Sequence, residues 1–162
     1  MIRIKPSEII GNNVNLLPID NITSKKFIND FHDYSRIENF YTFLTYDPFI
    51  KISQSAKYLE SLIKKSDQSH TQYWFIYLIN EKKIIGTIGL LNACAFSKSA
   101  EIGYGISPKY WGKGLFNDTA QLLINYINKE YRIRQFFAKT SKLNTNSVNA
   151  LARLGFIERA VI

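Results

Sequence analysis

The stretch "AEIGYGISPKYWGKGLF", residues 100–116, joins a β-type run to a helix through a glycine turn. Its first part is rich in apolar and aromatic residues and is stopped by Pro108. Its end starts a series with helical spacing, namely Phe116, Ala120, Leu123 and Ile127. Between the two parts, a pair of the chain's 8 glycines flanks one lysine. Because glycine weakens strands and helices alike, this pair indicates backbone that turns sharply or approaches a ligand closely.

A strand, a glycine turn and a helix together can bind phosphate, because the turn amides and the helix dipole attract negative charge. Two common versions of this arrangement are excluded. A Walker A loop fails, because Ser107 stands at its first glycine and Gly114 at its hydroxyl residue. A dinucleotide fingerprint also fails, because its last glycine would fall on Pro108 or Asn117.

On either side of this turn, helical and strand patterns alternate without repeats or linkers, which predicts one domain. The runs 72–80 and 84–92 are rich in β-formers and are joined by the charged turn "EKK", so they predict a hairpin. The other predicted elements are strands at 13–19, 100–107, 134–141 and 156–162, and helices at 23–34, 53–66, 116–127 and 144–155. This order predicts an α+β domain on a mixed sheet.

Capping residues indicate where two of these helices begin and end. Thr23 or Ser24 is the N-cap candidate of the first helix. Asn144 or Asn146 is the candidate for the last one, and Gly155 stops it. The last helix is therefore predicted to be short.

Two separate motifs resemble one family, the GNAT superfamily of N-acetyltransferases. The turn "KYWGKG", residues 109–114, resembles that family's Q/R-x-x-G-x-G/A loop, with Lys109 in place of the usual Gln or Arg. The stretch "NTNSVNALARLGF", residues 144–156, resembles the N-x-x-S…G-F element of the ribosomal-protein alanine N-acetyltransferase branch. A helix and a strand separate the two motifs, as in the family, and the order of elements follows it from residue 13 onward.

The resemblance implies a single GNAT domain over residues 1–162, with a mostly antiparallel mixed sheet flanked by helices. Two central strands, here "GYGIS" and "FFAKTS", would splay apart. Acetyl-CoA would be the co-substrate, with its pyrophosphate on the turn amides and Lys142 or Arg153 as further cationic contacts. The residues implied to bind it are Ile106, Lys109, Trp111, Gly112, Lys113, Gly114, Leu115, Phe116 and Asn144. The residues alone leave Trp111, Ile106, Phe116 and Tyr104 open to a packing role.

The resemblance also suggests two catalytic residues. Ser147 matches a serine near the cofactor sulfur, where a hydroxyl could protonate the leaving thiolate; it could equally be an ordinary first-turn helix serine. Related branches carry a tyrosine acid at the position of Leu151, which this chain lacks. Glu101, an acid in an otherwise apolar strand, is the candidate general base, with a structural ion pair as the alternative.

Composition limits the partners. The chain of 162 residues has 21 Lys and Arg against 13 Asp and Glu, a net charge of +8 that suits a phosphate-bearing cofactor or a solvated surface. No nucleic-acid motif, apolar run of membrane-spanning length or metal-ligand cluster is found, so we expect no nucleic acid, membrane or metal partner. Cys94, the single cysteine, fits a cytoplasmic location and is expected to be buried.

The predicted function is transfer of an acetyl group to a primary amine, with a protein N-terminus favoured by the branch resemblance. An aminoglycoside, an amino sugar, a polyamine, or acyl-CoA binding without turnover are the alternatives. The aromatic segment 40–49 is expected to line the acceptor site. The chain ends one strand earlier than the family pattern, which predicts an open edge and a homodimer formed near 156–162, a short sheet, or a truncated chain.

Overall fold

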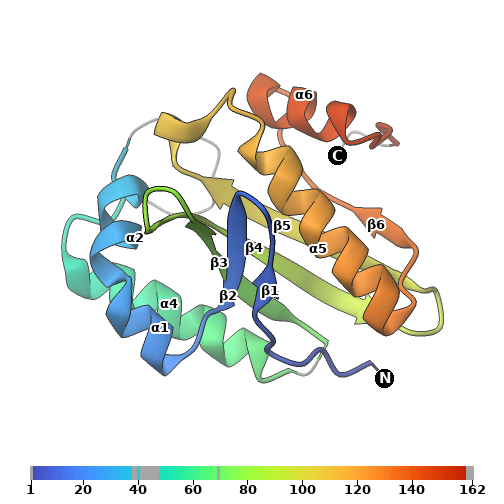
Figure 1. Ribbon diagram of the computed structural model, residues 1–162, viewed down its shortest axis with the longest axis horizontal. Helices are drawn as coiled ribbons and strands as arrows, with labels where there is room; N and C mark the ends of the chain where they lie inside the picture. Colours follow the sequence, from blue (N-terminus) through green and yellow to red (C-terminus); the bar gives the residue numbers. More distant parts are fainter. Residues whose placement is uncertain (1, 38–39, 41–47, 69, 160–162) are drawn as a thin grey trace.

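The computed structural model describes residues 2–37, 40, 48–68 and 70–159. Over these residues one sheet carries six strands in the order in which they follow in the chain (Figure 1). They are β1 (Ile9–Ile10), β2 (Val14–Pro18), β3 (Gln72–Leu78), β4 (Lys83–Cys94), β5 (Ser99–Ile106) and β6 (Gln135–Phe137). Neighbours from β1 to β5 pair antiparallel, and β5 pairs with β6 in parallel. The predicted α+β class and the mostly antiparallel mixed sheet are confirmed.

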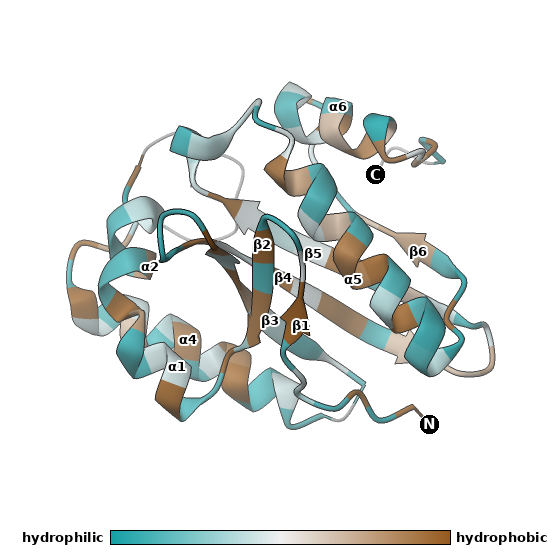
Figure 2. Ribbon diagram, in the orientation of Figure 1, coloured by the Kyte–Doolittle hydropathy of each residue, from teal (hydrophilic) through white to brown (hydrophobic). Residues whose placement is uncertain are grey.

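Helices cover both faces of this sheet. They are α1 (Asn21–Lys26), α2 (Ile28–Ser35), α4 (Ile52–Ser66), α5 (Leu115–Tyr131) and α6 (Thr145–Arg153), with a 3-10 turn, η1, at Pro108–Tyr110. Figure 2 shows hydrophobic and hydrophilic residues mixed along α5, as in an amphipathic helix with one buried side. Among the described residues, none of these helices combines the length and the apolar character needed to cross a membrane.

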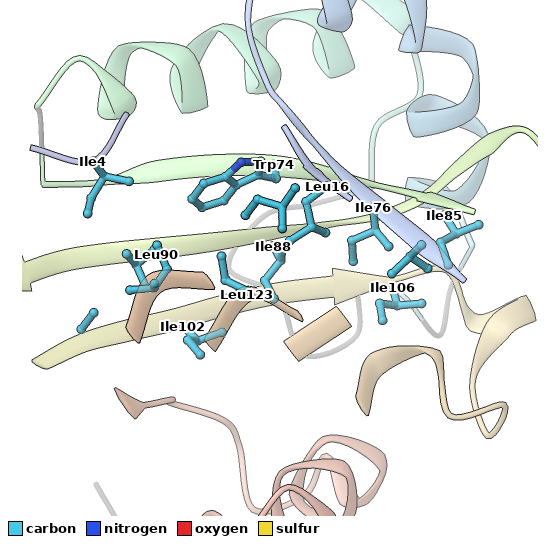
Figure 3. Close-up of a cluster of buried hydrophobic side chains, with 14 of the residues drawn as sticks. Ile4, Leu16, Trp74, Ile76, Ile85, Ile88, Leu90, Ile102, Ile106 and Leu123 are labelled. Atoms are coloured by element: carbon cyan, nitrogen blue, oxygen red, sulfur yellow. The ribbon is translucent and has the colours of Figure 1, made fainter. Parts of the chain in front are cut away.

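The described residues form two core clusters, one on each face of the sheet. Leu123 and Ile127 of α5 pack with Trp74, Ile76 and the apolar side chains of β4 and β5 (Figure 3). Tyr73 and Phe75 belong to the cluster of α2 and α4. Successive side chains of a strand point to opposite faces. After Gln72, β3 carries only apolar and aromatic side chains, because both of its faces are buried.

The predicted helix at 23–34 is wrong in its bounds, because two helices meet at Phe27, which has φ −110° and ψ 14°. The N-cap is Asp20, outside the predicted span. Its Oδ1 accepts from the amides of Ile22 at 2.9 Å and Thr23 at 2.8 Å, and the Thr23 hydroxyl accepts from the Asp20 amide at 3.0 Å. Thr23 therefore occupies the N3 position of a capping box. The N-cap is the carboxylate of Asp20 and not the predicted hydroxyl of Thr23 or Ser24.

We expect Asp20→Ala to lower the free energy of unfolding by about 1 kcal/mol, because α1 loses a side-chain acceptor for two amides. Asp33→Ala is the matched control: Asp33 is 75% exposed and lies 3.9 Å from Arg36, a geometry that contributes little to stability. Urea unfolding of both variants measures the difference. Equal losses would contradict a capping role for Asp20.

Two predictions near the C-terminus are corrected. The strand expected at 134–141 is limited to β6, and residues 156–159 form no strand, while 160–162 lie outside the described residues. β6 offers three paired residues, of which Gln135 and Phe137 are exposed, so its edge is too short to align the expected last strand. An ion pair of 3.4 Å between Lys142 and Glu158 connects this segment to the loop before α6 instead.

Cys94 is exposed, contrary to expectation. It lies at the end of β4, where the register with β5 shifts between Leu91 and Cys94. A bulge of this kind changes which side chains face the core. Hydrogen bonds from Ser97 and from the backbone lower the pKa of the Cys94 thiol.

Candidate active site between two diverging strands

The site begins where β5 and β6 separate. Their pairing ends at Glu101 and Phe137, while β5 continues to Ile106. Beyond β5 the chain passes through η1 and the glycine turn into α5, and beyond β6 it leads into α6, which lies near the start of α5 (Figure 1). The splay expected between "GYGIS" and "FFAKTS" is therefore present, with the glycine turn and α6 at its open end.

The glycine turn has the backbone that its sequence indicates. Gly112 and Gly114 both have φ +74°, a left-handed conformation that side chains rarely adopt. A Cβ at either position would meet nothing within 4 Å, so the turn borders open space. Gly114 caps α5 without a side-chain hydrogen bond, which leaves first-turn amides free to bind an anion.

A pocket of about 240 Å³ occupies this open end, between the turn and α6. Three predicted residues, Glu101, Lys109 and Lys113, are outside its lining. The predicted residues that do line it are Ile106, Trp111, Gly112, Gly114, Leu115, Phe116, Asn144 and Ser147. The turn, the strand end and the second motif, which are distant in sequence, thus meet at one cavity.

Some lining residues had not been singled out for the site. Asn146, Asn149 and Ala150 line the pocket from α6, beside Arg153, which the resemblance implies as a cationic contact. Their spacing of three and four residues marks one face of a helix, and this signal was present in the sequence. Tyr104, which had been interpreted as a core residue, lines the same pocket.

Ser147 is held in place from two sides. Its amide donates to Asn144 Oδ1 at 3.2 Å, so Asn144 is the N-cap of α6. Of the two predicted candidates, Asn144 and Asn146, the first is therefore confirmed. Its hydroxyl shares a hydrogen bond with the hydroxyl of Tyr104, in which either can donate. Burial raises the pKa of Tyr104, an effect that the hydrogen bond to Ser147 partly opposes.

Trp111 connects the turn to the strand. Its indole Nε1 donates to the carbonyl oxygen of Ile106 at 2.8 Å, and the side chain remains 37% exposed at the pocket. Ile106 itself is buried in the core cluster of α5. The side chain of Ile106 therefore packs in the core, and its carbonyl oxygen accepts from Trp111. A cofactor contact at this residue would be made by backbone atoms and not by the side chain.

The lysine at the centre of the turn is engaged with an aromatic ring. Lys113 Nζ lies 5.4 Å from the ring centroid of Tyr110, and Lys83 Nζ lies 5.5 Å from the same ring. The Tyr110 hydroxyl donates to Glu81 in the β3–β4 turn. Burial, followed by the hydrogen bond to Glu81, raises the pKa of Tyr110. These contacts anchor the loop to the hairpin and place two cations at its edge.

Glu101 lies outside the pocket, at the last residue of the β5–β6 pairing. Its side chain is 15% exposed and its Oε2 is 3.4 Å from Lys139 Nζ. Since side chains alternate along β5, Glu101 and Tyr104 point to opposite faces of the strand. Lys139 is thus the partner that the ion-pair alternative requires. The Glu101 carboxylate also lies next to the point where β5 and β6 separate.

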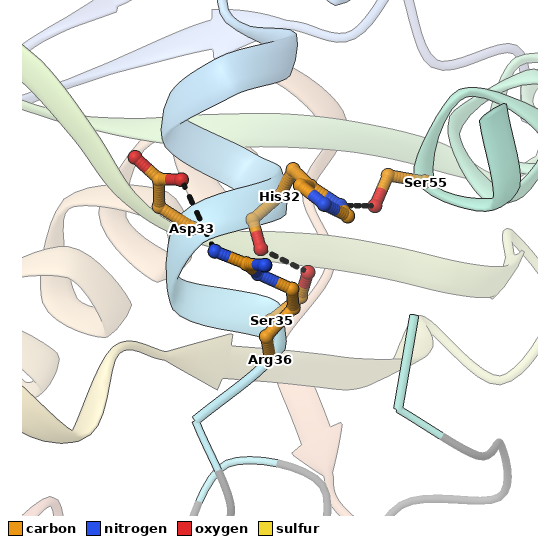
Figure 4. Close-up of polar contacts among 5 residues, drawn as sticks. All are labelled: His32, Asp33, Ser35, Arg36 and Ser55. Carbon is orange, nitrogen blue, oxygen red and sulfur yellow. Dashed lines mark hydrogen bonds and ion pairs between the residues drawn. The ribbon is translucent and has the colours of Figure 1, made fainter. Parts of the chain in front are cut away.

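A second polar contact lies elsewhere, between α2 and α4. His32 Nδ1 and Ser55 Oγ are hydrogen-bonded at 2.7 Å, with both residues buried (Figure 4). Burial is the main cause that lowers the pKa of His32, followed by the charge of Arg36. Within the described part of the chain, no group of three or more His, Cys, Asp and Glu residues could hold a metal. The histidine therefore joins two helices.

The fold and this pocket define the class of protein. The chain belongs to the acetyltransferase (GNAT) domain family, whose model matches residues 26–157. It is 26% identical over 120 residues to the uncharacterized N-acetyltransferase p20 of Bacillus licheniformis, covering 74% of this chain and 67% of that one. It is 33% identical over 90 residues to the [ribosomal protein uS5]-alanine N-acetyltransferase of Escherichia coli, covering 55% of this chain and 46% of that one.

Solved structures share the fold. The microcin C7 self-immunity acetyltransferase MccE, solved in complex with acetyl-CoA and AMP, superposes with a TM-score of 0.75 at 23% identity. The match covers 90% of this chain and 79% of that one. The match to the acetyltransferase domain family confirms the resemblance to the GNAT superfamily that the two motifs carry.

Proposed function

We propose that this protein is an N-acetyltransferase that moves an acetyl group from acetyl-CoA to a primary amine. The observation that supports this most directly is the pocket at the splay, which has a phosphate-type glycine turn at one end and the Ser147 hydroxyl within it. Membership of the acetyltransferase domain family agrees with this, as do the N-acetyltransferase names of the relatives.

The residues present fit acetyl-CoA. The amides from Gly112 to Phe116 would bind the pyrophosphate at the start of α5, assisted by Lys109, Lys113 and Arg153. The Trp111 amide, which the resemblance also implies, donates to the Pro108 carbonyl. The strand end at Ile106, no longer paired to β6, would contact the pantetheine arm through its backbone. Asn144 would close the other side while capping α6.

The reaction needs a base for the amine and a proton for the leaving sulfur. Glu101 would accept the amine proton, directly or through water, on one face of β5. Ser147 would donate to the sulfur on the other face, inside the pocket. With the thioester bound where β5 and β6 separate, the two groups would act on the amine nitrogen and on the sulfur on either side of its carbonyl carbon.

For the acceptor we propose a protein N-terminus, because two relatives are named as ribosomal-protein alanine or serine acetyltransferases. The charge of +8 disfavours polycationic acceptors. Phe40, the first residue of the aromatic segment 40–49, lines the pocket, and its ring lies 3.0 Å from where a Cβ on Gly105 would be. Residues 41–47 are outside the described residues. Phe49, at the other end of the segment, packs against Phe31 and Tyr58 and is outside the pocket lining.

The test has two stages. A thermal-shift titration with acetyl-CoA measures binding, and thiol release is then followed with peptides bearing N-terminal alanine or serine, an aminoglycoside, an amino sugar and a polyamine. We expect stabilisation by acetyl-CoA and release that depends on a peptide amine. Binding without release for any amine would favour the acyl-CoA-binding alternative, and no binding would reject the proposal.

We expect Glu101→Gln to depress the low-pH limb of the pH–rate profile. At low pH the amine is protonated and needs a base, whereas at high pH it is already free. Glu158→Gln is the matched control. Glu158 also pairs with a lysine at 3.4 Å, but it follows α6 and its side chain is 62% exposed. An unchanged low-pH limb in Glu101→Gln would place the base elsewhere.

A further inference from the structure

Tyr104 lies at a position that the reaction described above does not use. It is three residues beyond Glu101, the last β5 residue paired with β6, so it stands inside the splay. Its side chain lines the pocket, and its hydroxyl is hydrogen-bonded to that of Ser147. The bond connects strand β5 to helix α6 across the cavity.

The surroundings of Tyr104 keep its phenol protonated. The ring packs against Phe116 of α5, with centroids 4.2 Å apart, and pairs with Ile88 across β4. Among the described residues that line the pocket, Arg153 alone carries a charge. Burial raises the pKa of the phenol, so near neutral pH it holds its proton.

We propose that Tyr104 and Ser147 form a two-hydroxyl relay that delivers a proton to the leaving sulfur, an inference that rests on the proposed acetyl transfer. The observation that carries it is the hydrogen bond between the two hydroxyls inside the pocket. Ser147 is the group that would touch the sulfur, and Tyr104 acts through it. A tyrosine on β5 thus supplies the acid that Leu151 on α6, buried and apolar, does not.

The amine nitrogen bonds to the thioester carbonyl carbon, the carbon–sulfur bond breaks, and its electron pair goes to sulfur. The Ser147 hydroxyl proton moves to that sulfur, and the Tyr104 proton moves to the Ser147 oxygen. The amine proton leaves through the base to solvent, and water returns a proton to the Tyr104 phenolate.

Chemistry favours the pair over serine alone. A phenol is a far stronger acid than an aliphatic hydroxyl, with an ordinary pKa of about 10. Ser147 alone would have to form an alkoxide or take its replacement proton from water. With Tyr104 behind it, the negative charge moves onto the aromatic ring, which stabilises it.

The test uses the full chain, acetyl-CoA and the amine acceptor with the highest thiol release. Single-turnover rates are measured for the wild type, Tyr104→Phe, Ser147→Ala and the double variant, in H₂O and in H₂O–D₂O mixtures, and acetyl-CoA affinity is measured by calorimetry. Tyr77→Phe is the matched control, because it removes a phenol hydroxyl from β3, outside the pocket lining. Circular dichroism and melting temperature establish that each variant is folded.

We expect Tyr104→Phe to slow turnover by about tenfold, less than the loss of Ser147, because the serine can still draw a proton from water. Acetyl-CoA affinity should stay within about twofold, and the double variant should be no slower than Ser147→Ala, since the two hydroxyls act as one unit. The dependence of the wild-type rate on deuterium fraction should be curved, because the two protons of the relay move together. It should be closer to linear in Tyr104→Phe, where water restores the serine proton after the step.

If Tyr104→Phe turns over as fast as the wild type, the relay is overturned and the proposed function still stands. Multiplying effects of the two single variants, or a loss of rate matched by a loss of acetyl-CoA affinity, would also overturn it, because the phenol would then only shape the pocket. Absence of amine-dependent thiol release by the wild type would reject the proposed function and the relay together.

Discussion

Replacing Gly112 with valine is expected to weaken acetyl-CoA binding by about 100-fold or more, while the protein stays folded. Gly112 has φ +74° and lines the pocket, with nothing within 4 Å of the position that a Cβ would take. The two branches of valine would fill that space and block the approach of the pyrophosphate to the turn amides. The strained backbone, at a cost of roughly 1–2 kcal/mol, would also displace these amides.

The matched control is Gly155→Val. Gly155 has φ +93° and equally open surroundings, so it bears comparable backbone strain, but it follows α6 and is outside the pocket lining. Calorimetric titration with acetyl-CoA and melting curves of both variants separate blocked binding from lost stability. Unchanged acetyl-CoA affinity in Gly112→Val would reject the assignment of the turn as the pyrophosphate site.

Ser147→Ala is expected to lower the turnover number by about 100-fold with little change in acetyl-CoA affinity. A proton donor to the leaving sulfur acts most strongly as the carbon–sulfur bond breaks, so its loss is felt in the transition state and hardly in the bound ground state. The amide of Ser147, which donates to Asn144, remains in the variant, so the cap of α6 is kept.

Ser66→Ala on α4 is the control for removing a helix hydroxyl. The Ser66 hydroxyl is part-buried and donates to the carbonyl of Leu62, remote from the pocket. Turnover and acetyl-CoA dissociation constants are measured for both variants under the same conditions. Equal rates for Ser147→Ala and wild type would mean that Ser147 only belongs to the first turn of a helix.

Much of the fold could be predicted from local pattern. The β3–β4 hairpin, α4 and α5 follow from spacing and turn residues within a short window, and the cap of α6 is Asn144, one of two predicted candidates. The predicted bounds are wrong where a contact with a residue distant in sequence sets the end of an element. Phe27 interrupts the first helix while packing against Phe75 and Tyr77 of β3, with ring centroids 6.0 Å away in each case, and no helical spacing signals that contact.

The sequence by itself determined the chemistry of the turn: two glycines with a left-handed backbone, followed by a helix whose first amides are open, are properties of the residues themselves. It also determined, through the second motif, that Asn144 and Ser147 share one helix start. Which side chains meet across the cavity was decided only by the tertiary structure. Tyr104 has the pattern of any half-buried strand aromatic, and its partner is 43 residues away. The hydrogen bond to Ser147 exists because β5 leaves β6 after Glu101 and α6 packs over the gap, a long-range arrangement that a local window of sequence does not contain.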